Sequence, residues 1–414
     1  MSDTQRESAR ALDYKDYRNY LTARFLMTFS VQMQSVAIGW QVYAATGDTL
    51  DLGLIGLSQF LPFVLLVLPA GHIADRMNRR LILTLCYAVE ALCAVLLLLY
   101  TLSGLTVVWP VFATLVLFGG ARAFSMPTNF AITPNLVPRT AFPNAVALNS
   151  SSTHLATIIG PAAGGMLYLL GAGTVYVTVG VILILAMAMM ARVSVPRVIR
   201  AAEPAGWRTV LEGLRFVKSR PVVLGAISLD LFAVLFGGAT AMLPAYASDV
   251  LHVGPVGLGW LRTAPAIGAG ITAATLAFHP IGRQVGRWLF SGVAVFGLAI
   301  IVFGISHSFT LSLCSLILLG AGDMVSVYIR HLLVQLETPD AIRGRVSAVN
   351  AVFIGASNEL GEFESGVTAT WFGLIPSVVI GGAATLMVTG LWMRLFPSLS
   401  GMDRLPEKQE ETGY

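Results

Sequence analysis

Charged residues are scarce in this chain of 414 residues. Asp, Glu, Lys and Arg together make up 12% of it, whereas 56% of the residues are hydrophobic. A soluble domain is roughly a quarter charged, so this composition excludes an ordinary soluble protein. About twelve apolar stretches of roughly 20 residues, the length that crosses a hydrocarbon core, leave no room for a soluble catalytic domain. The net charge of +4 then reflects membrane topology and does not indicate a nucleic-acid partner.

Cysteine is rare as well. The chain has 3 cysteines, Cys86, Cys93 and Cys314, and all of them fall within apolar stretches. Cys86 and Cys93 stand seven positions apart on one predicted helix, which is too far for a disulfide. No CxxC pair suggests a metal or redox site. We therefore expect three buried packing residues and neither a metal nor another cofactor.

Several motifs of enzyme chemistry are also missing. The sequence contains no GxxxxGKS or GxxxxGKT loop, no GxSxG element and no HExxH pair. ATP-driven transport, acyl transfer and zinc hydrolysis therefore lack the residues that usually perform them. We do not expect an enzyme, and an ion gradient, by default a proton gradient, becomes the expected source of energy.

Long apolar runs are what the chain has in abundance. Trp40, Trp109, Trp260 and Trp288 fall near the ends of these runs, where amphipathic rings prefer to lie. The pattern predicts an all-α integral membrane protein with twelve transmembrane helices. The predicted spans cover residues 19–45, 52–74, 81–102, 107–126, 144–169, 173–192, 222–247, 257–278, 287–305, 309–330, 345–371 and 374–395.

Lys and Arg are distributed unevenly between the predicted loops. With the N-terminus in the cytoplasm, every one of the 26 Lys and Arg residues except Arg262 is assigned to the cytoplasmic side. Cations retained on that side orient a bacterial-type membrane protein. We therefore expect a multi-pass protein of the cell (inner) membrane with both termini in the cytoplasm. Tyr14, Tyr17 and Tyr20 precede the first span and are interpreted as interfacial anchors.

One long connection divides the chain. Within residues 193–221, the apolar residues from Trp207 to Val217 recur with helical spacing, which predicts an amphipathic helix. We interpret it as a linker and lipid anchor on the cytoplasmic surface, with partner binding as the alternative. The predicted divisions are a cytoplasmic tail (1–18), a six-helix half (19–192), this linker (193–221), a second six-helix half (222–396) and a C-terminal cytoplasmic tail (397–414).

The two predicted halves repeat each other. A shift of 201 residues places Gly119 on Gly320 and Asn149 on Asn350. A shift of 208 residues places the loop GHIADRMNRR, residues 71–80, on HPIGRQVGRW, residues 279–288. Parallel six-helix halves of this kind are the architecture of a class of secondary transporters.

The loop of residues 71–80 resembles the signature of the major facilitator superfamily between its second and third spans. That signature runs Gly-x-x-x-Asp-Arg-x-Gly-Arg-Arg, and the matching residues are Gly71, Asp75, Arg76, Arg79 and Arg80. Asn78 stands where the family usually has glycine, and Asn tolerates the left-handed backbone of a tight loop better than most residues. The resemblance implies alternating access of a small-molecule transporter.

A narrower resemblance lies in the eleventh predicted span. The stretch GASNELGEFESG, residues 355–366, is similar to the corresponding stretch of enterobactin-exporter-like members, a branch that also holds macrolide efflux proteins. This resemblance implies proton-driven export of a small molecule.

Ionisable residues inside predicted spans cost roughly 2.5–3.5 kcal/mol each and usually mark a pathway. Glu359 and Glu362 are three apart and share a helix face, with Asn358 one turn from Glu362. Two acids this close in a low dielectric do not both ionise easily, which suits a proton carrier. The alternative is a pair neutralised by a cation such as Arg262, without a transport role. Glu364 points to another face.

A second group of charges is expected at a cytoplasmic gate. Arg122 and Asp323 occupy equivalent positions in the repeat, towards the cytoplasmic ends of the fourth and tenth predicted spans. The resemblance implies that these spans help to form the inner gate. They either pair with each other or within their own halves, Arg122 with Asp75 and Asp323 with Arg330 or Arg343. The remaining predicted gate residues are the loop charges Asp75, Arg76, Arg79 and Arg80 and their counterparts Arg283 and Arg287.

Four more polar residues lie within spans. Asp230 and Arg24 are candidates for a proton relay or for interhelical ion pairs. Glu90 stands in an otherwise apolar span, where it either points inward or serves a proton path. His154 is a candidate substrate contact in the fifth span, or a histidine hydrogen-bonded between helices.

The sequence thus predicts a secondary active transporter. The leading hypothesis is proton-coupled efflux of a small amphipathic molecule, either a siderophore of the enterobactin type or a drug such as a macrolide. The alternative is an importer, symporter or uniporter, of a small nutrient; a membrane sensor or intramembrane enzyme is a remote third. The expected partners are the substrate, protons and the lipid bilayer, with no nucleic acid, and we expect a monomer.

Overall fold

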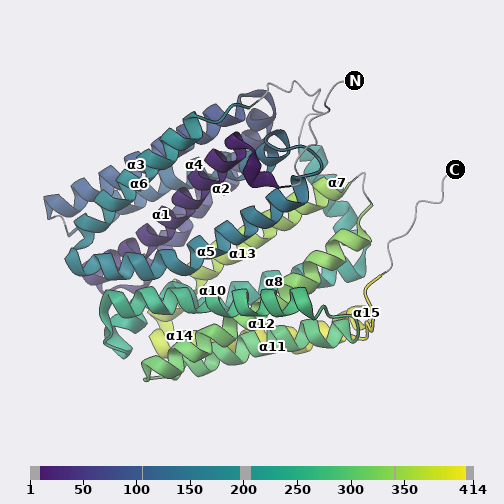
Figure 1. Ribbon diagram of the computed structural model, residues 1–414. Coiled ribbons are helices and arrows are strands. Elements are labelled where there is room, and N and C mark those ends of the chain that lie inside the picture. Colours follow the sequence, from purple (N-terminus) through teal and green to yellow (C-terminus); the bar gives the residue numbers. More distant parts are fainter. Residues whose placement is uncertain (1–9, 105, 196–206, 340–341, 407–414) are drawn as a thin grey trace, which may run out of the picture. The chain divides into compact units, whose positions relative to one another are not determined.

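Helices joined by short turns make up the protein. The computed structural model describes residues 10–104, 106–195, 207–339 and 342–406, and this part of the chain contains no strand (Figure 1). The main helices are α1 (Lys15–Thr46), α2 (Thr49–Arg76), α3 (Arg79–Ser103), α4 (Trp109–Ile132), α5 (Phe142–Leu167), α6 (Ala172–Ala191), α7 (Trp207–Ser219), α8 (Pro221–Phe236), α10 (Gly254–Phe278), α11 (Val285–Gly304), α12 (Phe309–Glu337), α13 (Arg343–Phe372) and α14 (Leu374–Leu395). Short segments complete them: η1 (Ala11–Asp13), η2 (Thr133–Asn135), η3 (Tyr168–Leu170), η4 (Gly238–Met242), α9 (Leu243–Ala245), η5 (Tyr246–Val250) and α15 (Pro397–Ser400).

Nine helical stretches of the described residues are long and apolar enough to cross a membrane. They lie in α2, α3, α4 with η2, α5 with η3, α6, the run from α8 to η5, α11, α12 and α14. The sequence predicts spans in α1, α10 and α13 as well. These three helices are less apolar because α1 carries charges and glutamines, α13 carries glutamates, and α10 carries Arg262 among many small residues. The helices that are poorest as apolar spans are therefore rich in candidate functional groups.

The signature loop is shorter than predicted. α2 continues to Arg76 and α3 begins at Arg79, so only Met77 and Asn78 connect them. Asn78 does not use the left-handed backbone that asparagine tolerates. It is extended, with φ −67° and ψ 112°, and its side chain accepts a hydrogen bond from the backbone N–H of Arg80. Asn78 therefore acts as the N-cap of α3, a role for which asparagine is well suited.

The described residues form two compact units. The first contains residues up to Thr46 together with Ser58–Ala205, and the second contains Gly47–Leu57 together with Gly206 onwards. The first turns of α2 thus belong to the second unit although the rest of α2 belongs to the first. In the first unit, α1 packs on α5 and α6, and α3 packs on α4 and α6 (Figure 1).

Tyrosines of α1 lie in the core of the first unit. Tyr17 and Tyr20 are fully buried. The Tyr17 hydroxyl donates to the carbonyl of Ala145, at 2.8 Å, and to Asn149 Oδ1, at 3.1 Å. The prediction that Tyr17 and Tyr20 anchor the chain at a lipid interface was wrong, because the Tyr17 hydroxyl joins α1 to α5 and the Tyr20 hydroxyl donates to the carbonyl of Asn129 on α4.

In the second unit, α12 packs between α10 and α11, while α14 packs on α11 and α8 (Figure 1). α13 packs on α8 and on η4. The predicted span at 222–247 is interrupted, since α8 ends at Phe236 and 3-10, α and π turns follow as far as Val250. Gly237 and Gly238 stand at this interruption, and a Cβ on Gly238 would meet the carbonyl oxygen of Gly361.

The amphipathic helix α7 also belongs to the second unit. It packs on α13 and α8, and its Val217 is buried with Val223, Ile227 and Val346 in one apolar cluster. Val217 is therefore covered by protein, whereas Leu214 of the same predicted apolar face is 40% exposed, so the expected lipid contact stays a prediction. Arg197 and Arg200 of the predicted linker lie outside the described residues.

Glycine allows the closest helix contacts. A Cβ on Gly268 of α10 would overlap the carbonyl of Ile317, and a Cβ on Gly320 of α12 would overlap the carbonyl of Pro265. Backbones can approach this closely only where no side chain intervenes. Gly119, which the repeat pairs with Gly320, likewise faces the carbonyl of Gln59 in the first unit.

Candidate functional site

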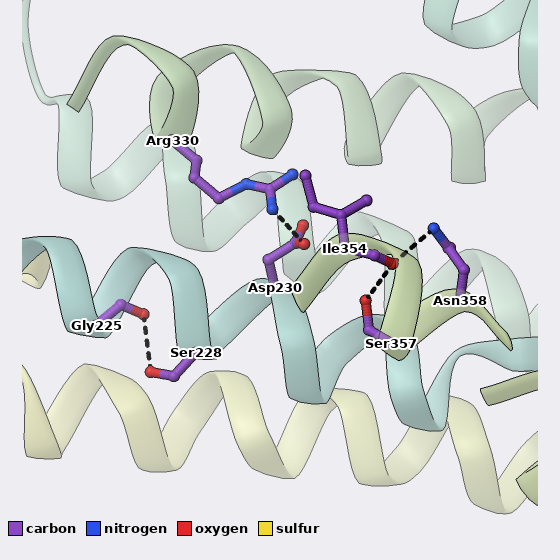
Figure 2. Close-up of polar contacts among 7 residues, drawn as sticks. All are labelled: Gly225, Ser228, Asp230, Arg330, Ile354, Ser357 and Asn358. Atoms are coloured by element: carbon purple, nitrogen blue, oxygen red, sulfur yellow. Dashed lines mark hydrogen bonds and ion pairs between the residues drawn. The ribbon is translucent and has the colours of Figure 1, made fainter. Parts of the chain in front are cut away.

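A buried ion pair joins α8 to α12. Arg330 Nη1 donates to Asp230 Oδ2, and the two residues are 2% and 4% exposed (Figure 2). The sequence analysis gave two alternatives for Asp230, a proton relay and an interhelical ion pair. The structure gives it a partner, and such a pair offsets much of the cost of two buried charges through mutual attraction and a charge-assisted hydrogen bond.

A second acid shares this site. Asp323 precedes Arg330 by two helical turns on α12, so both lie on one face, and the charges of Asp230 and Arg330 act on it electrostatically. Asp230, Asp323 and Ser326 line a cavity of about 10 Å³, together with apolar residues of α8 and α11. That volume is close to the lower limit for one water molecule. Two carboxyl groups thus line a space of water size, and the guanidinium of Arg330 bonds one of them and acts electrostatically on the other.

The prediction that Arg122 and Asp323 lie towards helix ends was wrong. α4 runs from Trp109 to Ile132 and α12 from Phe309 to Glu337, so each residue stands near the middle of its helix. α12 continues beyond the expected end at residue 330, because the following residues keep an amphipathic helical pattern. The guanidinium of Arg122 lies 5.6 Å from the ring centre of Phe63 on α2.

A third acid lies where α13 meets α10 and the start of α2, within the second unit. Glu362 is the acid whose charge acts on Arg262 of α10. Its Oε2 lies 2.6 Å from the position that a Cβ on Gly56 would take, so the missing side chain at Gly56 leaves room for the carboxyl group. Glu359, one turn earlier, is buried at 9% exposure. The structure therefore brings Arg262 within electrostatic reach of Glu362, while the part of Glu359 and Glu362 in transport stays a prediction.

Two other polar residues of α13 point elsewhere. Asn358 is exposed, and its Nδ2 donates to the carbonyl of Ile354, at 3.0 Å (Figure 2). Ser357 donates to the same carbonyl. Asn358 thus has a local backbone partner, and Glu364 is partly buried on another face of the helix.

The predicted gate arginines are tied to backbone in the first unit. Arg79 donates to the carbonyl of Ala131 at the end of α4, at 2.8 Å, and Arg80 donates to the carbonyl of Val193, at 3.4 Å. Arg283 and Arg287 are exposed, and Arg287 donates to Gln284. The side chains of Asp75, Arg76 and Arg343 lie outside the described residues.

The remaining predicted residues fall in the first unit. Arg24 donates to the Tyr20 hydroxyl at 3.3 Å. His154 is exposed on α5. Glu90 is 1% exposed on α3. Of the cysteines, Cys86 and Cys93 are buried as expected, whereas Cys314 is exposed, because its position on α12 faces away from the helices packed around it.

Arg330 is the functional candidate that sequence reasoning undervalued. It was considered only as a partner for Asp323, since one helix carries both. The signal that could have found it was its spacing of seven residues from Asp323, which places the two side chains on one face. Nothing local in the sequence pointed to Asp230, because 100 positions separate it from Arg330.

Apolar membrane helices that hold paired and shared charges in their interior define a class of protein, the polytopic membrane transporters. Residues 10–411 match the model of the transmembrane secretion effector family. The chain belongs to this family, a branch of the major facilitator superfamily, and is a multi-pass membrane transporter and not an enzyme.

Two curated relatives match most of the chain. It is 27% identical to the multidrug efflux pump Tap of Mycolicibacterium fortuitum over 384 residues, which cover 85% of this chain and 90% of the pump. It is 25% identical to the enterobactin exporter EntS of Shigella boydii over 382 residues, which cover 87% of this chain and 89% of the exporter.

Solved structures share the fold at lower identity. A D-xylose–proton symporter superimposes with a TM-score of 0.73 at 13% identity, covering 94% of this chain and 99% of the symporter. A POT family transporter superimposes with a TM-score of 0.74 at 12% identity, covering 94% and 97%. These likenesses show the fold alone.

Proposed function

We propose that this transporter exports a small amphipathic molecule in exchange for protons. It does so by alternating access between two six-helix halves made of twelve membrane spans. It works as a monomer in the inner membrane, with both termini in the cytoplasm. The substrate is a siderophore of the enterobactin type or a drug such as a macrolide.

The observation that carries the proton coupling is the cluster of Asp230, Asp323 and Arg330. One guanidinium can balance one carboxylate. If both acids were ionised, the cluster would hold a net negative charge inside the membrane, and an uncompensated buried charge costs several kcal/mol. The second carboxyl group therefore takes up a proton whenever the cluster is shielded from water. Exposure to water on one side would allow that proton to leave.

Asp323 is the acid assigned to the proton. Both acids line the water-sized cavity, but Asp230 already accepts the hydrogen bond from Arg330, which favours its ionised form. A proton that enters from outside binds Asp323 in one conformation and leaves to the cytoplasm in the other. Coupling follows if the outward-open and inward-open states differ in the proton affinity of this cluster.

The direction of transport is inferred from the relatives. The two curated relatives described above are an efflux pump and an exporter, and each matches this chain over nearly its full length. The two relatives differ in their cargo, since one is a multidrug pump and the other exports enterobactin. We therefore propose an amphipathic small molecule, the class that includes both kinds of substrate. Support for two equivalent halves comes from Gly119 and Gly320, which face backbone carbonyls in the same manner.

Inside-out membrane vesicles test this proposal. The interior is acidified by respiration or by a pH jump, and accumulation of enterobactin or of a macrolide is measured by mass spectrometry. We expect the wild type to accumulate one of them only while the gradient lasts. Asp323→Asn should abolish this gradient-driven accumulation. It should retain exchange of the substrate across the membrane when the pH is equal on both sides. Ser326→Ala, which changes the same cavity without an acid, is the matched control and should accumulate normally.

An importer is the alternative, since the fold is shared with a D-xylose–proton symporter. Uptake into right-side-out vesicles with an inward proton gradient would support that alternative. Gradient-driven accumulation by Asp323→Asn at the wild-type rate would contradict the assignment of Asp323.

A further inference from the structure

Glu90 is a buried acid of the first unit. It stands in the middle of α3, on the face that packs against neighbouring helices, and it is 1% exposed. Neither of its carboxyl oxygens has a hydrogen-bond partner among the residues that the structure describes. Buried polar groups are bonded in the large majority of cases, so a carboxyl group with two unbonded oxygens requires an explanation.

The state of this carboxyl group follows from the energetics of burial. An ionised carboxylate without hydrogen bonds in a low dielectric costs several kcal/mol, even with a cation at some distance. A neutral carboxyl group costs far less in the same place. The geometry therefore favours a Glu90 that carries its proton in the conformation described here.

Few other groups can compete for this proton. On α3 itself, Cys86 and Tyr87 are buried one turn before Glu90, and the Tyr87 hydroxyl has no hydrogen-bond partner in the described part of the chain. Cys93, one turn later, donates its thiol to the carbonyl of Thr114 on α4. Neither Cys93 nor Tyr87 therefore bonds the carboxyl group of Glu90 in this conformation.

The surrounding helices supply one charge that acts on Glu90. Arg122 of α4 is the cation that interacts with it electrostatically. α6, which also packs on α3, contains no charged residue, and its Tyr176 hydroxyl donates to Gln41. Arg24 of α1 acts on Tyr87, as does Tyr20. Burial favours the neutral form of Glu90 most strongly, and Arg122, whose guanidinium lies over the ring of Phe63, is the cation that opposes it.

We propose that Glu90 is a second proton-binding residue of this transporter, neutral in the conformation described here and ionised when Arg122 reaches its carboxylate. The step is a simple proton transfer. The carboxyl O–H bond breaks, the proton passes to water, and Arg122 and Glu90 are left as an ion pair. This inference extends the proposed proton coupling, and the role of Glu90 in transport rests on that proposed function. The protonation of Glu90 can nevertheless be measured without any transport.

Infrared spectroscopy of the full-length protein in lipid vesicles tests the proposal. A protonated carboxyl group gives a carbonyl stretching band that a carboxylate lacks. We expect such a band at neutral pH in the difference spectrum between the wild type and Glu90→Gln, in which the bands of other protonated carboxyl groups, such as that of Asp323, cancel. The difference spectrum between the wild type and Cys86→Ala, a matched substitution at a buried position of the same helix, should lack it. Glu90→Gln keeps the shape of the neutral acid, so it is expected to fold. Identical spectra of the wild type and Glu90→Gln would overturn the proposal.

Variants at Arg122 test the assigned switch. With Arg122→Leu, the Glu90 band should persist to higher pH than in the wild type, because the ionised form loses its stabilising cation. Arg122→Lys retains the charge and should titrate close to the wild type. A band that disappears at the same pH in all three proteins would contradict the role of Arg122. A Glu90 band in a protein that shows no proton-driven accumulation would support this inference while refuting the proposed coupling.

Discussion

Arg330 and Asp230 are expected to differ sharply in their tolerance of substitution, although they are partners in one ion pair. Arg330→Met removes the cation and leaves two carboxyl groups, Asp230 and Asp323, around one small cavity. Removing one member of a buried pair typically costs about 3–5 kcal/mol, because the other charge is left uncompensated. Asp230→Asn leaves Arg330 with Asp323 as a neighbouring acid, so its cost should be only about 1–2 kcal/mol, that of a weakened hydrogen bond.

The free energy of unfolding of the purified protein in mixed detergent micelles measures this difference. Tryptophan fluorescence follows the transition as the denaturing detergent is increased. Arg394→Met is the matched control, since this arginine is exposed at the end of α14 and its loss should change stability by less than about 0.5 kcal/mol. The double variant Asp230→Asn with Arg330→Met should be more stable than Arg330→Met alone. Equal destabilisation by Asp230→Asn and Arg330→Met would refute the sharing of Arg330 by two acids.

Three further predictions concern helix contacts. Gly320→Val should cost about 1–3 kcal/mol or prevent folding, because its Cβ would overlap a carbonyl of α10, whereas Gly390→Val has open space and should be tolerated; gel filtration of the detergent-solubilised protein compares them. Tyr17→Phe should cost about 1–2 kcal/mol in the same unfolding assay, since a buried hydrogen bond between α1 and α5 is lost. Glu362→Gln should lower the thermal midpoint by removing the acid that acts on Arg262, and exchange of the two residues should restore part of it; no recovery would show that the charges are not coupled.

Hydropathy predicted the apolar helices well. The expected span 374–395 coincides with α14, and the span 173–192 differs from α6 by one residue at each end. A segment that crosses the hydrocarbon core must satisfy all its backbone hydrogen bonds internally, so it is helical over its whole apolar length. The apolar composition of the segment therefore predicts the helix. The ends of helices were predicted less well where polar residues continue the helix, as in α12. Hydropathy marks the residue at which a segment stops being apolar, and the helix can continue beyond it.

The candidate site was only partly predictable. Hydropathy marks Asp230, Glu90 and Glu362 as acids within apolar surroundings, and the structure places all three inside packed helices. Which groups they meet depends on how helices distant in sequence are rotated and packed. The partner of Asp230 and the isolation of Glu90 therefore required the structure, because no local pattern encodes them.

The Asp230–Arg330 pair also has a consequence for the synthesis of the protein. The two residues are 100 positions apart, so at about 5–20 residues per second the ribosome adds Arg330 roughly 5–20 seconds after Asp230. During that interval, α8 must remain in the membrane or at its edge without its cation, at a cost of about 2.5–3.5 kcal/mol for the charged acid. The strongly apolar residues that flank Asp230 offset this cost. They serve the nascent chain before the ion pair exists, and variants that reduce them should fail at membrane insertion even if the finished protein would tolerate them.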